Sequence, residues 1–301
     1  MVCCVKGLNS RPVQYRTPPG GDPSLAESTL PPVTPHSESI TGYFSRRAET
    51  FYPQSIARGG WGESVSGHVV GGLLGWAAER VVDDAAFLPA RLTVDLPRPT
   101  AFEPVDLETR VIRNGGRLRL VEVVMLQGGE VVAQATGLFL RRGEHPAGTV
   151  WSPDIEMPPF PTDVQSSDNA LFVRTYGWGM AIQNPDPNWS GEGGKKFTWL
   201  RLTQPLIQDE PLTPFTRAAM AADVTASLVN WSSDGLKFIN ADYTVTLSRL
   251  PDGPMIGLAS QGHCGHDGIA TGSATIFDQH GKIGTSVAVS LAQAGFRPPS
   301  A

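Results

Sequence analysis

The sequence predicts a duplicated α+β fold, in which two similar units each wrap a β-sheet around one central helix. A block of similar pattern occurs at residues 67–142 and again at 216–293. Each copy starts with a helix rich in small residues and continues with four β-like runs, of which the first read LTVDLPRP and YTVTLSRL. Small side chains let other backbone approach closely, so a sheet can curve around each helix. Two units placed side by side then cover each other's open sheet edge.

The composition narrows the possible partners. The chain has 301 residues, a formal net charge of −5 and a pI of about 5.7. Nucleic acids and anionic membranes bind a clustered basic face, so we expect neither as the main partner. No apolar stretch reaches the ~18 residues of a membrane span, and the N-terminus does not read as a secretory signal. Three cysteines without regular spacing favour a reducing cytoplasm and no disulfide framework.

The first folded unit is predicted to begin at residue 42. Residues 1–41 are rich in Pro, Ser, Thr and Gly, so we expect that segment to be disordered. The first unit spans 42–142, and Ser64 or Ser66 can cap its helix at 67–82. The four predicted strands of this unit are 88–97, 105–113, 117–127 and 130–141.

A Pro-rich stretch at 143–169 predicts a linker between the two units. The second unit spans 170–293, and its helix starts after a capping Thr213 followed by Pro214, a residue that the first helical turn tolerates. We expect that helix to end at about Trp231. The four predicted strands of this unit are 236–249, 255–262, 268–277 and 282–292, and residues 294–301 form a tail.

Three stretches together resemble the double hotdog acyl-CoA thioesterases, in particular the thioesterase II family and its actinobacterial relatives. GHVVGG at 67–72 is similar to the Gly-rich start of that family's first central helix. LTVDLPRP at 92–99 and NADYTVTLSR at 240–249 are similar to the strands that follow the two helices. The resemblance covers about 42–293. It implies two tandem hotdog units and hydrolysis of acyl-CoA, with no cofactor other than the coenzyme A moiety of the substrate.

The resemblance also implies an Asp–Thr–Gln set that activates a water molecule. Asp242 falls on the aspartate, whereas the region of the threonine reads HCGHD at 263–267 and the region of the glutamine reads GTSVAVSL at 284–291. Strand alternation places Asp242 with the polar set, so it points into a cleft between the units or is simply a solvated residue at a strand end. Gln134, within an apolar run of the first unit, supplies the missing amide or is a hydrogen-bonded core glutamine.

A second candidate acid lies on the second helix. Asp223 is flanked by alanines and valine, so it needs a partner or an outward face. Asn230 and Asn240 are placed to orient either acid. Gly67 and His68 begin the first helix, where backbone N–H groups stabilise an oxyanion. His68 is itself either a base or a capping or packing residue.

His263 and His266 could form a substituted polar site in the region of the missing threonine. Together with Cys264 they superficially resemble a metal cluster. Without a second cysteine pair or an acidic ligand at fixed spacing, we expect a polar loop between two strands and no metal.

Three functions remain open. The first is a thioesterase that hydrolyses medium- or long-chain acyl-CoA, with Leu73, Leu74, Val224 and Leu228 lining an acyl tunnel. The second is a non-hydrolytic acyl-CoA-binding protein, which the missing Thr and Gln favour. The third is a hotdog hydratase or dehydratase, which needs an Asp–His motif that neither helix offers. The apolar outer faces and exposed edges of such sheets further predict a homodimer of double hotdogs.

Overall fold

The computed structural model describes residues 41–161, 172–176, 182–183, 195–232 and 234–297. Residues 1–40 of the segment expected to be disordered and 162–169 of the expected linker lie outside the described residues.

The described residues form the elements that the sequence predicts, with some additions. The first half holds β1 (Phe44–Arg47), β2 (Thr50–Pro53), a 3-10 turn η1 (Ser55–Ala57), α1 (Gly67–Val82), β3 (Phe87–Asp95), β4 (Val105–Asn114), β5 (Leu118–Gln127) and β6 (Glu130–Arg141). The second half holds β7 (Phe172–Tyr176), β8 (Ile182–Gln183), β9 (Phe197–Arg201), α2 (Pro214–Asn230), β10 (Trp231–Ser232), β11 (Gly235–Leu236), β12 (Phe238–Leu247), β13 (Met255–His266), β14 (Ile269–Asp278) and β15 (Gly281–Ala292).

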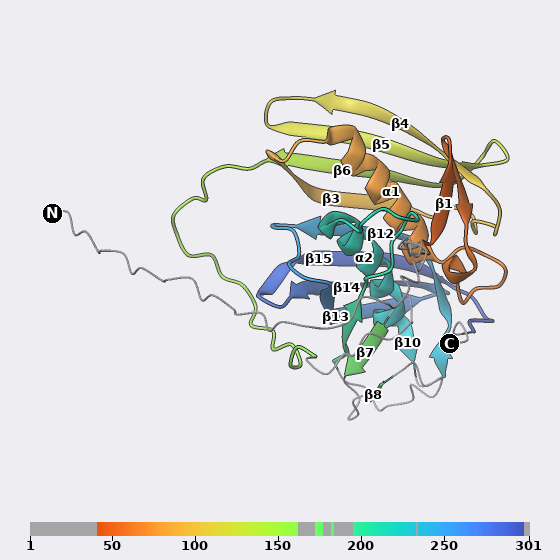
Figure 1. The fold of residues 1–301 in the computed structure, drawn as a ribbon. Helices are drawn as coiled ribbons and strands as arrows, with labels where there is room; N and C mark the ends of the chain where they lie inside the picture. The colour runs from red at the N-terminus through yellow and green to blue at the C-terminus, as the bar shows by residue number, and fades with distance from the viewer. Residues whose placement is uncertain (1–40, 162–171, 177–181, 184–194, 233, 298–301) are drawn as a thin grey trace, which may run out of the picture. The chain divides into compact units, whose positions relative to one another are not determined.

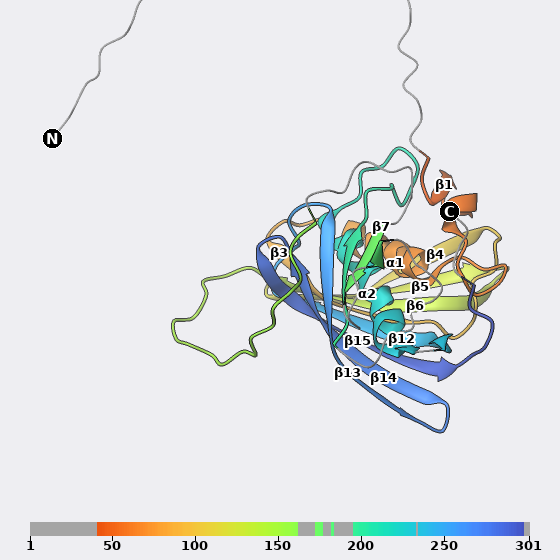
Figure 2. The same cartoon turned by 90° about the horizontal axis from the view of Figure 1, so that it is seen from below.

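In the described part of the chain, thirteen strands form one sheet. Their order is β1-β2-β4-β5-β6-β3-β12-β15-β14-β13-β9-β7-β8, and each neighbouring pair is antiparallel. The sheet curves around α1 and α2, which lie side by side on one face (Figures 1 and 2). This confirms two units, each with a central helix, and a continuous sheet across them.

The two units join where β3 pairs with β12. Thr93 and Thr244 occupy the same place in the two repeats, and they lie directly opposite each other across this junction. The Thr244 hydroxyl donates to Thr93 Oγ1 at 3.0 Å. Equivalent residues meet in this way only near a two-fold axis, so the halves are related like the subunits of a symmetric dimer. The predicted double hotdog is confirmed.

Flanking residues determine where α1 ends and where α2 begins. Asp83 has left-handed backbone (φ 36°) and its N–H donates to Glu79 O, which terminates α1. Thr213 Oγ1 accepts from Thr216 N at 3.0 Å, and Pro214 follows it, so the predicted start of α2 is confirmed. Small residues set the helix contact, because a Cβ on Gly75 would stand 3.0 Å from Ala219 Cβ.

The predicted polar loop at residues 263–266 is wrong. These residues continue β13, where His263 pairs with Gly272 and His266 with Ile269. The turn is shorter than expected and consists of Asp267 and Gly268, both with positive φ (49° and 77°). Two consecutive residues in this conformation match the twist of a two-residue hairpin, so the strands pair up to the turn itself.

Two arginines equivalent in the repeats form ion pairs. Arg249 binds Asp278 through both guanidinium nitrogens, and the Asp278 side chain is buried. Asp278 also accepts from the backbone N–H groups of Asp252 and His280, so it ties two loops together. Arg98 bonds to Glu130 Oε2 at 3.0 Å on the surface.

The linker packs on the second unit, and the tail packs on both units. Ile155 joins a small apolar cluster with Trp199 and Phe277, and Trp199 Nε1 donates to Pro158 O at 3.1 Å. Within the expected tail, Phe296 packs against Trp61 and Trp231, with ring centroids 5.1 and 5.6 Å apart. The tail therefore joins the residues that precede α1 to those that follow α2.

Candidate functional site

The N-terminus of α1 faces an acid on α2. A Cβ added to Gly67 would stand 2.6 Å from Asp223 Oδ1 and 3.1 Å from Oδ2, so glycine is what lets the carboxylate approach the helix. The first N–H groups of a helix have no intrahelical acceptor and carry the positive end of its dipole. The structure thus places a carboxylate beside the first turn of α1, and it brings together the predicted residues Gly67 and Asp223.

Asn240 holds this carboxylate. Its Nδ2 donates to Asp223 Oδ1 at 2.7 Å and to the Asp223 backbone O at 3.1 Å. A β-bulge shifts the register of β12 against β15 between Asn240 and Asp242. A bulge adds one residue to a strand and thereby changes the face that side chains use. As a result Asn240 faces α2, on the same side as Tyr243, although simple alternation would place it opposite.

The environment of Asp223 suits a proton acceptor. Burial raises its pKa to about 6, although the hydrogen bond from Asn240 lowers it. Gly67, His68, Asp223, Val224 and Asn240 are nevertheless all half-buried, whereas the neighbouring residues 69–70 and 221–222 are buried. The residues at this end of the helix pair therefore form a strip that solvent reaches.

Tyr243 closes the space behind the acid, and its role was not identified from the sequence. Its hydroxyl donates to Ala219 O at 3.0 Å and would lie 1.6 Å from a Cβ on Gly71. Burial and the nearby Asp223 charge raise its pKa well above the usual value. The glycine spacing at 67, 71 and 75 was the available signal, because it marks one helix face that other groups approach closely.

His68 lies in the first turn of α1. Its Nδ1 lies 2.7 Å from Ser66 Oγ, and its ring packs edge-on against Tyr43 at 5.6 Å between centroids. Burial lowers its pKa to about 4, so the ring is neutral at pH 7. The predicted alternatives were a base and a capping or packing residue. The contact with Tyr43 fits packing, and a neutral ring is compatible with each alternative.

Asp242 and Gln134 lie elsewhere. Asp242 alternates with the buried Tyr243, so it lies on the sheet face opposite the helices and not in a cleft beside them. Its Oδ1 accepts from Val289 N at 2.9 Å. Its cross-strand neighbour Asp95 accepts from Gln134 Nε2 at 3.1 Å. The sequence prediction that Gln134 is a core glutamine is wrong, because this side chain is exposed.

Partial burial raises the pKa of Asp242, the hydrogen bond from Val289 N lowers it, and the charge of Asp95 raises it. The structure therefore separates the predicted site residues into two groups on opposite faces of the sheet. Asp223, Asn240, Gly67 and His68 lie on the helix face, and Asp242 and Gln134 lie on the outer face.

The histidines of β13 do not join either acid. His263 Nδ1 lies 2.9 Å from Asn230 Oδ1, and Asn230 Nδ2 donates to Ser290 Oγ at 3.0 Å. Asn230 thus orients these groups rather than an acid. The His266 side chain is 90% exposed at the hairpin end, where it contacts Asp267. Among the described residues, no group of three His, Cys, Asp or Glu side chains is arranged to hold a metal ion.

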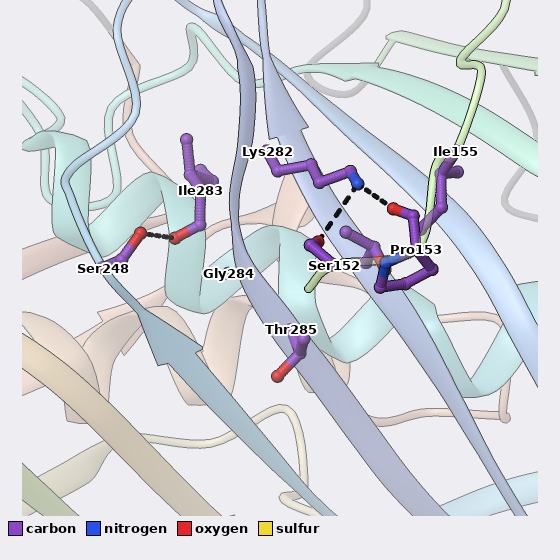
Figure 3. A pocket seen from close by; sticks show the side chains of 9 residues that line it. Ser152, Pro153, Ile155, Ser248, Lys282, Ile283, Gly284 and Thr285 are labelled. Carbon is purple, nitrogen blue, oxygen red and sulfur yellow. Dashed lines mark hydrogen bonds between the residues drawn. The ribbon is translucent and has the colours of Figure 1, made fainter. Parts of the chain in front are cut away.

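A cavity of about 240 Å³ lies beneath the linker, away from the acid (Figure 3). Lys282 Nζ crosses it to Pro153 O and Ser152 Oγ, and Ser248 Oγ donates to Ile283 O. It lies beside Gly284 of β15, whereas Asn240 pairs with Ser290 of that strand. Six residues of strand span about 20 Å. Because linker and sheet already satisfy these polar groups, we interpret the pocket as a half-open surface gap between the linker and the sheet.

Two family models match consecutive parts of the chain. The one described as acyl-CoA thioesterase N-terminal domain matches residues 57–140, and the one described as acyl-CoA thioesterase C-terminal domain matches 154–291. Their boundary falls between the two units of the fold. No curated protein matches the sequence.

Solved structures share the whole fold. The tesB protein of Mycobacterium avium subspecies paratuberculosis superposes with a TM-score of 0.60 at 17% identity, over 85% of this chain and 96% of that one. An acyl-CoA thioesterase II from Mycobacterium marinum superposes with a TM-score of 0.56 at 19% identity, over 84% of this chain and 96% of that one. A hot dog fold protein from Alicyclobacillus acidocaldarius superposes with a TM-score of 0.58 at 18% identity, over 83% of this chain and 96% of that one.

Proposed function

Because the chain belongs to the acyl-CoA thioesterase family, we propose that it hydrolyses an acyl-CoA to the free acid and coenzyme A at the site between α1 and α2. The observation that carries this proposal is the Asp223 carboxylate held against the glycine at the N-terminus of α1. Such a site offers a proton acceptor and oxyanion donors a few ångströms apart, which are the two requirements of thioester hydrolysis.

Asp223 is the proposed general base. Asn240 occupies Oδ1, which leaves Oδ2 to accept a proton from water. The water oxygen bonds to the thioester carbon while its proton passes to Asp223. N–H groups in the first turn of α1 stabilise the oxyanion of the tetrahedral intermediate. The C–S bond then breaks, and the leaving sulfur takes the proton from Asp223 to give the thiol of coenzyme A.

We propose a medium- or long-chain acyl group, which would place the reaction in lipid metabolism. Half-buried Val224 next to Asp223 offers an apolar wall for the first part of the chain. Leu73, Leu74 and Leu228 of the expected tunnel are wholly buried in the packed core. A long chain would therefore have to displace core contacts or run along the Val224 side.

Release of free thiol from acyl-CoAs, from acetyl to palmitoyl, tests the proposal. We expect turnover that is highest for medium or long chains. Binding of every acyl-CoA by calorimetry without thiol release would overturn hydrolysis. That result would support the alternative of a non-hydrolytic binder, which the family residues missing from the sequence favour. A maximum at acetyl-CoA would overturn only the proposed chain length.

A homodimer and a cytoplasmic location stay proposals. Val287, Val289 and Leu291 form an exposed apolar row on the outer face of β15, with Ile269 beside them on β14. Rows of this kind are suited to pairing with a second copy. We expect light scattering at micromolar concentration to give twice the chain mass of 32.2 kDa, and a mass of one chain would contradict the dimer.

In the described residues, no helix is long and apolar enough to cross a membrane.

A further inference from the structure

The first turn of α1 contains a buried polar atom that the protein does not satisfy. His68 Nε2 is buried and has no hydrogen-bond partner within the described part of the chain. Leaving such a group unpaired costs about 1–3 kcal/mol, so it calls for an explanation such as a catalytic role or a bound water or ion. The ring follows directly on Gly67, the residue that faces the Asp223 carboxylate.

Ser66 determines what Nε2 can do. Ser66 is the N-cap residue of α1, yet its side chain makes no capping hydrogen bond to the helix. Its hydroxyl is instead 2.7 Å from His68 Nδ1. When the hydroxyl donates to Nδ1, the single proton of a neutral imidazole must lie on Nε2. Nε2–H is then a donor without an acceptor.

We infer that Ser66 fixes the tautomer of His68 so that Nε2–H donates a hydrogen bond to the carbonyl oxygen of the bound thioester. This hydrogen bond strengthens as that oxygen becomes an oxyanion. His68 is then a catalytic residue and Ser66 a positioning residue. The inference rests on the proposed hydrolysis, which needs donors beside its base. A base is already supplied by Asp223, so a second acceptor at Nε2 would have no role in that reaction. The low pKa of His68 keeps the ring neutral over the working pH range.

Two substitutions at His68 separate a donor from a packing residue. We expect His68→Leu to lower kcat by about 10²–10³ with little change in KM, as for loss of one oxyanion donor. His68→Gln keeps an N–H donor on a side chain of similar reach, so we expect it to stay within about tenfold of the unmodified enzyme. If both variants fold and lose activity equally, or if His68→Leu keeps full kcat, the inference fails.

The tautomer is measured directly by ¹⁵N NMR of the imidazole. We expect a protonated Nε2 and an unprotonated Nδ1 in the unmodified protein, and a mixture of tautomers in Ser66→Ala together with a fall in kcat. Protonation of Nδ1 instead would overturn the inference. Because NMR needs no turnover, this measurement stands even if the chain releases no thiol, and so separates failure of the inference from failure of the proposed hydrolysis.

Discussion

Asp223→Asn is expected to lower kcat for thiol release by about 10²–10⁴, the usual contribution of a general base, while acyl-CoA binding stays nearly intact. Asparagine has almost the same shape, and Asn240 can still reach its Oδ1, so the helix contact should be kept. Thiol release at saturating substrate measures the loss, and calorimetry with the same acyl-CoA measures binding.

Asp242→Asn is the matched control, because it makes the same chemical change on the opposite face of the sheet. We expect its kcat to stay within a few-fold of the unmodified enzyme, since its carboxylate accepts from Val289 N and lies away from the helix N-termini. Full activity in Asp223→Asn together with inactivity in Asp242→Asn would show that the general base is Asp242 on the outer face, the residue to which the family resemblance assigned that role.

The pH dependence of the activity is a second test of Asp223 as the general base. A base works when ionised, so kcat/KM should rise with pH through a value of about 6, the pKa to which burial raises Asp223. Asn240→Ala removes the hydrogen bond that lowers this pKa. We therefore expect its rising limb to shift to higher pH, whereas Asp242→Asn should leave the limb in place.

Gly71→Ala is expected to destabilise the protein by about 3 kcal/mol, through overpacking of a filled core. Alanine normally favours a helix over glycine by roughly 1 kcal/mol, so the sign is the opposite of the usual one. The reason is the Tyr243 hydroxyl, which lies 1.6 Å from the position of the new methyl group. Urea denaturation of each variant measures the difference in the free energy of unfolding.

Tyr243→Phe supplies the control for that clash. Alone it removes the bond to Ala219 O and should cost about 1 kcal/mol. Combined with Gly71→Ala it removes the clashing oxygen, so the double variant should be more stable than the sum of the two effects predicts. Simple additivity would show that the helix moves away and that Tyr243 does not confine it.

The fold could be predicted because its signals are local and repeated. Helix α1 spans the predicted residues 67–82, since small residues at helical spacing are bounded by Ser66 and Asp83. The strands of both repeats match within a few residues, except that β13 extends to His266. There the sequence HCGH gives no alternation of apolar and polar residues, and only the short turn at Asp267–Gly268 fixes the pairing.

The site could be predicted only in part. Asp223 stood out because a carboxylate in an apolar helix needs a partner, and Asn240 was one of two proposed partners. The face that Asn240 uses could not be predicted, because alternation assumes an unbroken strand. One extra residue in the bulge turns Asn240 toward α2 and leaves Asp242 on the other side. Tyr243 was missed for the same reason, since its contact with Gly71 requires the register to be known.

The pairing of Thr93 with Thr244 shows that two once-equivalent halves meet at the centre of the sheet, yet they no longer carry the same groups. On α1 the one acid is Glu79, and it bonds to Thr213 at the start of α2, whereas Asp223 of α2 faces an open glycine. In an assembly of identical chains, every substitution appears twice and must suit both sites. Fusion of the halves removes that constraint. One half can then keep the acid that faces the first-turn glycine, while the other half uses an acid at a different helix position as a structural anchor, and each can diverge independently.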